Sequence, residues 1–422
     1  MSMAQQDPIV QPESVEKPVV RPIPLWRNRN FLLLMIGQNI SSVGSQVSQL
    51  AFSLLALTLT HSPAQAGLIT AARGLPFALL SLPAGALADR WNRKRVMILC
   101  DTGRAIALAS IPAAFVLGGL SVIQLYVVSL IEGTLFVFFS MAEVSALPHV
   151  VSKEQIATAA GQNELLYSGS QMVGPSIGGF LYSLSAMLPF LGDAISYAAS
   201  VLSLLFIRAQ FQQERAAKPQ HLWIEVKEGL AWLWHDSLIR FLAILTGGLI
   251  TPCVGYGLIL ILRAQEQHAS TTAIGFIFAA GGVGSCLGAA LASPLQKRFG
   301  FARTIIWSTW IWALSWLFFA IAPDPLLLGI LNGLSFAIVP IYMVAQYSYR
   351  LVTVPDHLQG RVNSVFRLVA FGSTPVGLAL TGWLLQFIGP IPTVLVLFIP
   401  QFILAIAATF NKTIWQASQL RI

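Results

Sequence analysis

Four ionisable residues of the 422-residue chain lie inside long apolar runs and are candidates for proton transport. They are Arg73, Asp101, Glu132 and Asp193. Charged groups in hydrocarbon are rare and commonly mark ion or proton pathways. A buried glutamate without a partner favours its neutral, protonated form, whereas one paired with arginine stays ionised and acts as a strut. The candidates for proton coupling are therefore Glu132, Arg73 and Asp193.

Glu132 and Arg73 occupy similar depths in two apolar runs, near residues 122–147 and 66–88, so their side chains could meet. Three interpretations of Glu132 remain open. It could carry a proton, it could form a fixed pair with Arg73, or it could lie at the exposed lip of a cavity.

The other acids have local interpretations. Asp193 falls in the first turns of its helix, where a carboxylate can satisfy free amides and the helix dipole, and this capping role is the one we favour for it. Asp101 and Arg104 are three residues apart, a spacing that predicts an ion pair on one helix face.

The apolar runs are the elements that must position these charges. The chain is 55% hydrophobic and 10% charged, whereas a soluble domain is about 25% charged. Its length leaves room for about twelve membrane-spanning helices of about 20 residues each. We expect spans near 31–58, 66–88, 96–118, 122–147, 160–183, 188–208, 238–262, 271–294, 303–322, 326–349, 361–386 and 391–410.

The spans divide into two halves around a polar central segment. The net charge of +8 comes from Lys and Arg concentrated in alternate loops, which is the positive-inside pattern rather than a nucleic-acid surface. Both termini are then cytoplasmic. The expected units are a disordered cytoplasmic tail (1–25), an N-terminal six-helix bundle (26–209), a cytoplasmic linker with an amphipathic helix (210–237), a C-terminal six-helix bundle (238–412) and a cytoplasmic tail (413–422).

The densest cluster of charge lies between the second and third spans, in Gly85-Ala-Leu-Ala-Asp-Arg-Trp-Asn-Arg-Lys-Arg95. This many charges cannot lie in hydrocarbon, so the segment is expected to form a hairpin in water. Asn92 is expected to adopt the left-handed conformation at its turn. The segment resembles the signature loop of the major facilitator superfamily, which usually has Gly at the Asn92 position. Residues 228–242 resemble the entry to span seven in its macrolide-efflux and siderophore-export branch.

This resemblance implies an all-α fold of two six-helix bundles and a gate latch. Asp89 would dock against the amino end of span eleven, near residues 360–362, when the cavity faces outward. Arg90, Arg93 and Arg95 would grip an acid near the inner ends of spans three and four. The residues implied in this gate are Asp89, Arg90, Arg93, Arg95, Glu143, Asp101 and Arg104. The alternative is that the bases only fix topology.

Span five carries a second resemblance, to the antiporter motif of the superfamily. Its core is Gly174, Pro175, Gly178 and Gly179. The glycines of such a motif allow two helices to pack closely, and its proline kinks the helix. Ordinary small-residue packing is the alternative.

Polar residues at helical spacing predict the wall of a central cavity, because amides and hydroxyls cannot face lipid cheaply. Packing against another helix is the alternative. The expected cavity-lining residues are Asn39, Gln46 and Gln49 in span one, and Asn332, Tyr342 and Gln346 in span ten.

We expect a secondary active transporter in the plasma or inner membrane that exports small amphiphilic compounds in exchange for protons, functions as a monomer and contacts the lipid bilayer. A siderophore or metabolite exporter and a lysolipid flippase are alternatives, and a transport-dead receptor or scaffold is the alternative from another class. The sequence has no Walker A loop and no HExxH, so no enzyme, metal or cofactor is expected and the proton gradient would supply the energy.

Overall fold

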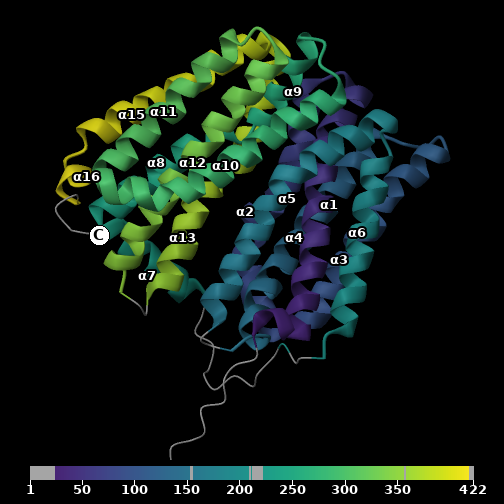
Figure 1. Ribbon diagram of the computed structural model, residues 1–422, viewed down its shortest axis with the longest axis horizontal. Helices are drawn as coiled ribbons and strands as arrows, with labels where there is room; N and C mark the ends of the chain where they lie inside the picture. The colour runs from purple at the N-terminus through teal and green to yellow at the C-terminus, as the bar shows by residue number, and fades with distance from the viewer. Residues whose placement is uncertain (1–23, 153–154, 209–210, 212–221, 356–357, 418–422) are drawn as a thin grey trace, which may run out of the picture.

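The computed structural model describes residues 24–152, 155–208, 211, 222–355 and 358–417, and every regular element within these ranges is a helix (Figure 1). The expected all-α class is confirmed. The expected N-terminal tail lies outside the described residues except for its last two, and Leu25 begins a short 3₁₀ helix.

The N-terminal bundle contains six long helices with short connections. They are α1 (Arg29–Thr60), α2 (Pro63–Arg90), α3 (Arg93–Val116), α4 (Val122–Ala146), α5 (Ile156–Leu184) and α6 (Leu188–Phe206). Each coincides with an expected span to within a few residues.

The C-terminal bundle contains six further spans, two of which are broken. The helices are α8 (Ser237–Cys253), α9 (Tyr256–Glu266), α10 (Thr271–Phe299), α11 (Phe301–Ile321), α12 (Pro325–Thr353), α13 (Gln359–Phe371), α14 (Thr374–Ile388) and α15 (Pro390–Phe410). Span seven breaks after Pro252, and span eleven breaks at Gly372 and Ser373 ahead of Pro375. Proline removes a backbone donor from each helix at these points.

Ten segments of the described chain are long and apolar enough to cross a membrane. The helices α2 and α5, of 28 and 29 residues, complete the twelve. Both lie between the bundles, where α2 packs on α14 and α5 packs on α10.

The two bundles meet closely at one end of the molecule. A Cβ atom on Gly67 of α2 would lie 2.8 Å from the Cα of Gly382 in α14, and one on Gly275 of α10 would lie 2.6 Å from the carbonyl oxygen of Pro175. Figure 1 shows the bundles meeting near α9 and diverging toward α7 and α13. We call the diverging end the basic end, since Arg93, Lys297 and Arg361 lie there.

The expected left-handed conformation of Asn92 is wrong. Asn92 has φ −67° and caps α3, with its side chain accepting a hydrogen bond of 3.1 Å from the amide of Arg95. A side-chain cap satisfies one free amide of the new helix, which a left-handed turn would leave open. The corresponding turn in the second half does use a positive φ, of +78° at Gly300.

The segment between the bundles forms the predicted helix, α7 (Leu222–His235). Leu233 is fully buried, whereas Leu230 and Trp234 are exposed. A Cβ on Gly229 would lie 2.7 Å from the carbonyl oxygen of Arg361, so α7 packs tightly on α13. The chain continues past α15 into α16 (Lys412–Ala417), whose Ile414 and Ala417 are buried, so this part of the expected C-terminal tail is helical.

Candidate functional site

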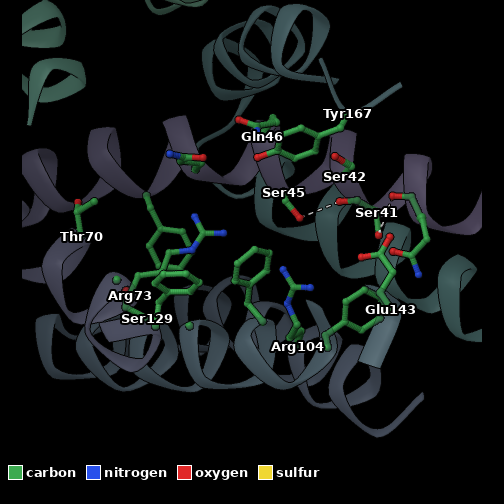
Figure 2. A pocket seen from close by; sticks show the side chains of 18 of the residues that line it. Ser41, Ser42, Ser45, Gln46, Thr70, Arg73, Arg104, Ser129, Glu143 and Tyr167 are labelled. Carbon is green, nitrogen blue, oxygen red and sulfur yellow. Dashed lines mark hydrogen bonds between the residues drawn. The ribbon is translucent and has the colours of Figure 1, made fainter. Parts of the chain in front are cut away.

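A cavity of about 390 Å³ lies against the N-terminal bundle (Figure 2). One wall is the polar face of α1, and Asn39, Gln46 and Gln49 all line it, as predicted. Phe52, Phe77, Phe136 and Phe139 contribute aromatic surface. The C-terminal bundle contributes Leu378 of α14 to this lining. The wall therefore combines amides, hydroxyls and aromatic rings.

Two arginines line the wall that faces α1. Figure 2 shows Arg73 of α2 and Arg104 of α3 on the opposite side of the cavity from Ser42, Ser45 and Gln46. The side chain of Arg73 is 21% exposed, whereas that of Arg104 is 4% exposed. Positive charge therefore borders the space where a ligand would lie.

Glu132 of α4 holds both arginines from behind the cavity wall. Its Oε2 lies 2.5 Å from Nε of Arg73, and its Oε1 accepts hydrogen bonds of 2.8 Å from Arg73 and 3.1 Å from Arg104. The hydroxyl of Tyr197 in α6 also donates to Oε1, at 3.1 Å. The expected meeting of Arg73 and Glu132 is confirmed. With three donors on one carboxylate, the fixed-pair interpretation fits best.

A close approach of α2 to α4 makes this pairing possible. The residue after Glu132 is Gly133, and any Cβ there would clash with the carbonyl of Arg73. Glycine thus allows the two backbones to touch and brings the charges within reach.

Asp101 belongs to the same cluster. It lies 3.7 Å from Nη1 of Arg104, as the three-residue spacing predicts, and accepts a hydrogen bond of 2.6 Å from Ser200. Arg104 in turn stacks over the ring of Tyr197, with its Cζ 4.0 Å from the ring centroid. Arg104 therefore links the acids of α3 and α4.

The capping role expected for Asp193 is wrong. Asp193 is fully buried on α6, one turn beyond the helix start, and its carboxylate accepts hydrogen bonds from Ser48 of α1 at 2.5 Å and from Ser196 at 3.0 Å. These donors are hydroxyls rather than free backbone amides. Asp193 is thus an acid held between two helices, without an ion pair among the described residues.

The expected gate is only partly described. The side chains of Asp89 and Arg90 lie outside the described residues, so the latch on span eleven stays a prediction. Arg93 donates to the carbonyl of Phe211 at 2.9 Å and contacts the ring of His149. Glu143 lines the cavity near its basic end.

At the amino end of α13, where the resemblance places the dock for Asp89, Arg361 forms an ion pair with Glu228 of α7. The linker helix therefore holds this end of span eleven. The signature loop at residues 85–95, which predicted the role of Asp89, gave no indication that Glu228 would contact the start of span eleven.

The glycines of α5 permit the predicted close packing. A Cβ on Gly178 would lie 2.7 Å from the carbonyl oxygen of Val47, and one on Gly174 would clash with Gln46. Gly179 faces the other bundle, where a Cβ would clash with the carbonyl of Thr271 in α10. This helix therefore packs closely against both bundles.

The cavity-lining prediction for α12 is not what the structure shows. Asn332, Tyr342 and Gln346 are buried inside the C-terminal bundle, and none lines the cavity described above. Asn332 accepts from Tyr256 at 2.6 Å, and the hydroxyls of Tyr342 and Thr246 lie 2.8 Å apart. For Asn332 and Tyr342 the polar spacing reflects bonding between helices, the alternative considered above, whereas Gln346 contacts Met343 on its own helix.

Sequence reasoning missed the hydroxyls that surround the acids. On α6, Tyr197 and Ser200 follow Asp193 at helical spacing. On α1, Ser45 and Ser48 are three residues apart and lie on one face of the helix. The hydroxyls of Ser45 and Tyr197 lie 2.8 Å apart and join the cavity wall to the buried cluster. Their spacing within apolar runs was the available signal.

The model of one protein family, described as transmembrane secretion effector, matches residues 22–418. The chain belongs to this family of the major facilitator superfamily. It is 26% identical to the multidrug efflux pump Tap of Mycolicibacterium fortuitum over 393 residues, covering 90% of this chain and 95% of Tap. It is 24% identical to the enterobactin exporter EntS of Escherichia coli, covering 86% of each.

Solved structures agree on the fold of this family member. The nucleoside transporter NupG superposes with a TM-score of 0.76 at 14% identity, covering 92% of this chain and 99% of NupG. A bacterial homologue of the lysosomal transporter Spinster, in an inward-facing and unoccupied conformation, gives 0.69 at 16% identity, covering 93% and 97%. The family match and the ten apolar segments make this chain a multi-pass membrane transporter, and the solved structures share its fold.

Proposed function

We propose that this transporter exports amphiphilic compounds in exchange for protons, with the basic end facing the cytoplasm. The observation that carries the proposal is the cavity itself. Its amide and phenyl lining suits bulky, mostly apolar molecules, and Arg73 and Arg104, the two bases of the buried charge cluster, form part of its wall. The multidrug efflux pump Tap, similar over most of the chain, supports this cargo class.

Charge balance favours Asp193 as the proton site. The cluster around Glu132 contains three acids (Asp101, Glu132 and Asp193) and two bases (Arg73 and Arg104), so full ionisation of these five groups would leave a net charge of 2 − 3 = −1. Glu143, a further acid nearer the basic end of the cavity, is not included in this count. A net charge buried in hydrocarbon is costly, and one proton neutralises it. Glu132 is held by both arginines, whereas Asp193 has only hydroxyl donors. Asp193 therefore takes the proton, and Glu132 orders the arginines.

The test uses purified protein in liposomes that trap a pH-sensitive dye, with cationic amphiphilic dyes as cargo. In Asp193→Asn, cargo movement should no longer drive proton flux, although cargo binding is kept. The matched control is Glu266→Gln, which alters a partly exposed acid paired with Arg263. Cargo-dependent proton flux that persists in Asp193→Asn contradicts the assignment of Asp193. An intact protein that moves no protons with any cargo contradicts antiport itself.

Anionic chelates of the siderophore type are a second candidate cargo. The specific observation is Arg73, whose guanidinium is partly exposed in the cavity wall, and EntS is a relative that exports enterobactin. Competition between a catecholate chelate and a cationic dye for one binding site separates the two cargo classes. Tighter binding of the chelate, lost in Arg73→Gln, would favour this second function.

A further inference from the structure

Arg350, three residues before the end of α12, is a buried cation. It is 8% exposed, and its Nε and Nη1 atoms have no hydrogen-bond partner. No carboxylate among the described residues forms an ion pair with it. Its Cζ lies 3.7 Å from the ring centroid of Phe366 in α13, which stabilises the charge from one face.

A second cavity, of about 210 Å³, lies directly beside this guanidinium at the basic end. Its walls come from the end of α12 and the start of α13. Two side-chain amides, Gln359 and Asn363, line it together with apolar groups and a phenol. The remaining lining residues are Tyr347, Leu351, Val354 and Val362. The cavity therefore offers a cation, polar amides and an apolar wall to one ligand.

An unpaired buried charge is costly, and a cation–π contact offsets only part of this cost. Two guanidinium nitrogens free to donate would suit an oxyanion, since arginine is well matched to carboxylate and phosphate oxygens. Since no described carboxylate meets these nitrogens, the cavity suits an acidic group that enters it from outside the bundle.

The depth of the site points to a phospholipid. Three residues of helix place Arg350 about 4.5 Å from the end of α12, which is at the level of the headgroups. The neighbouring Tyr347 and Leu351 are 47% and 45% exposed and give an acyl chain an apolar surface to follow. Basic pockets between helices at the cytoplasmic side suit acidic headgroups.

We propose that the cavity between α12 and α13 binds the phosphate group of an anionic phospholipid through Arg350. The site lies in the C-terminal bundle, apart from the cargo cavity against the N-terminal bundle. The phospholipid would bind in the absence of cargo and of a proton gradient. Lipid at this site would pin the basic ends of α12 and α13 together.

The test measures phospholipid binding to the full-length purified protein by native mass spectrometry and by its melting temperature in detergent. The probes are short-chain phosphatidylglycerol, phosphatidylcholine with the same acyl chains, and inorganic phosphate at constant ionic strength. Phosphatidylglycerol should bind and raise the melting temperature, and Arg350→Gln should weaken this binding about tenfold, a loss typical of one charge-assisted contact.

The matched control is Arg298→Gln, which removes an exposed arginine from α10 at the basic end and should leave lipid binding unchanged. If Arg350→Gln fails to fold, Arg350→Lys retains the charge without the planar guanidinium and should bind with intermediate affinity. Equal stabilisation of wild type by inorganic phosphate alone would overturn the lipid as ligand in favour of a free anion. Equal binding of phosphatidylglycerol by wild type and the Arg350 variants would overturn the site.

Discussion

At the residue scale, Glu132 decides the geometry of the cargo cavity. It is fully buried, yet it accepts hydrogen bonds from two arginines and one tyrosine that come from three other helices. One carboxylate thus fixes the relative positions of α2, α3, α4 and α6. The nearby Asp193 accepts hydrogen bonds only from hydroxyl groups. Neutralising the two acids by mutation should therefore change the stability of the protein to different extents.

Replacing Glu132 by Gln should destabilise the protein strongly. The variant leaves Arg73 and Arg104 buried without their shared anion, and breaking a buried pair in this way costs about 3–5 kcal/mol. The midpoint of thermal unfolding in detergent measures this. Glu266→Gln, which removes the partly exposed partner of Arg263, should cost about 0–1 kcal/mol. Equal effects of the two variants would contradict the strut role of Glu132.

Replacing Asp193 by Asn should barely change stability. The amide is close in shape to a protonated carboxyl: its oxygen can accept from one of the two serine hydroxyls, and its NH2 group can donate to the other, which rotates to accept. Substitutions that keep such bonds typically cost within about 1 kcal/mol. The same unfolding measurement applies. A loss as large as that of Glu132→Gln would mean that Asp193 is ionised and that its charge is structural.

At the scale of elements, glycine sets how closely the two bundles approach. Gly179 of α5 touches the backbone of α10 in the other bundle, and Gly67 of α2 touches Gly382 of α14 in the same way. These contacts lie at the end opposite the basic end. They close that end of the molecule through backbone contact, with little side-chain material between the helices.

Replacing Gly179 by Ala should open this end. The new methyl group would overlap the carbonyl of Thr271, and such overpacking costs about 1–3 kcal/mol, which disfavours the present conformation relative to its alternative. Distances between spin labels on α5 and α10 should lengthen or broaden. Gly169→Ala on the same helix is the matched control, because its Cβ meets no atom within 4 Å. Identical distance distributions in both variants would show that this contact does not hold the bundles together.

At the scale of the whole molecule, the cargo cavity is accessible from one end. Its lining runs from Thr70 and Gln49, deep between the bundles, to Glu143 and Tyr167 near the basic end. The close contacts of α2 with α14 and of α5 with α10 lie on the other side. This conformation therefore presents the cavity to the basic end.

A membrane-impermeant thiol reagent should reach Tyr167→Cys from the basic side and hardly at all from the other side. Cys100, Cys253 and Cys286 are first replaced, so that the introduced thiol is the one measured. Gly119→Cys, in the exposed loop between α3 and α4, should show the opposite sidedness. Labelling of right-side-out and inverted vesicles measures both. Equal labelling of Tyr167→Cys from both sides would contradict one-sided access.

The sequence by itself determined the twelve spans, the linker helix and the polar face of α1. Each depends on local composition and on side chains repeating along one helix, which the order of residues states directly. The pairing of Asp101 with Arg104 was predictable for the same reason, since both lie on one helix three residues apart.

Tertiary structure decided which polar residues meet. The amides of α1 face the cavity, whereas Asn332 and Tyr342 of α12, in an equally regular polar stripe, bond to α8, α9 and α10 inside their own bundle. Asp193 binds Ser48 across 145 residues, and Arg361 binds Glu228 across 133. Periodicity assigns a side chain to a face of its helix, but the helix that covers that face is set by how all the helices pack together.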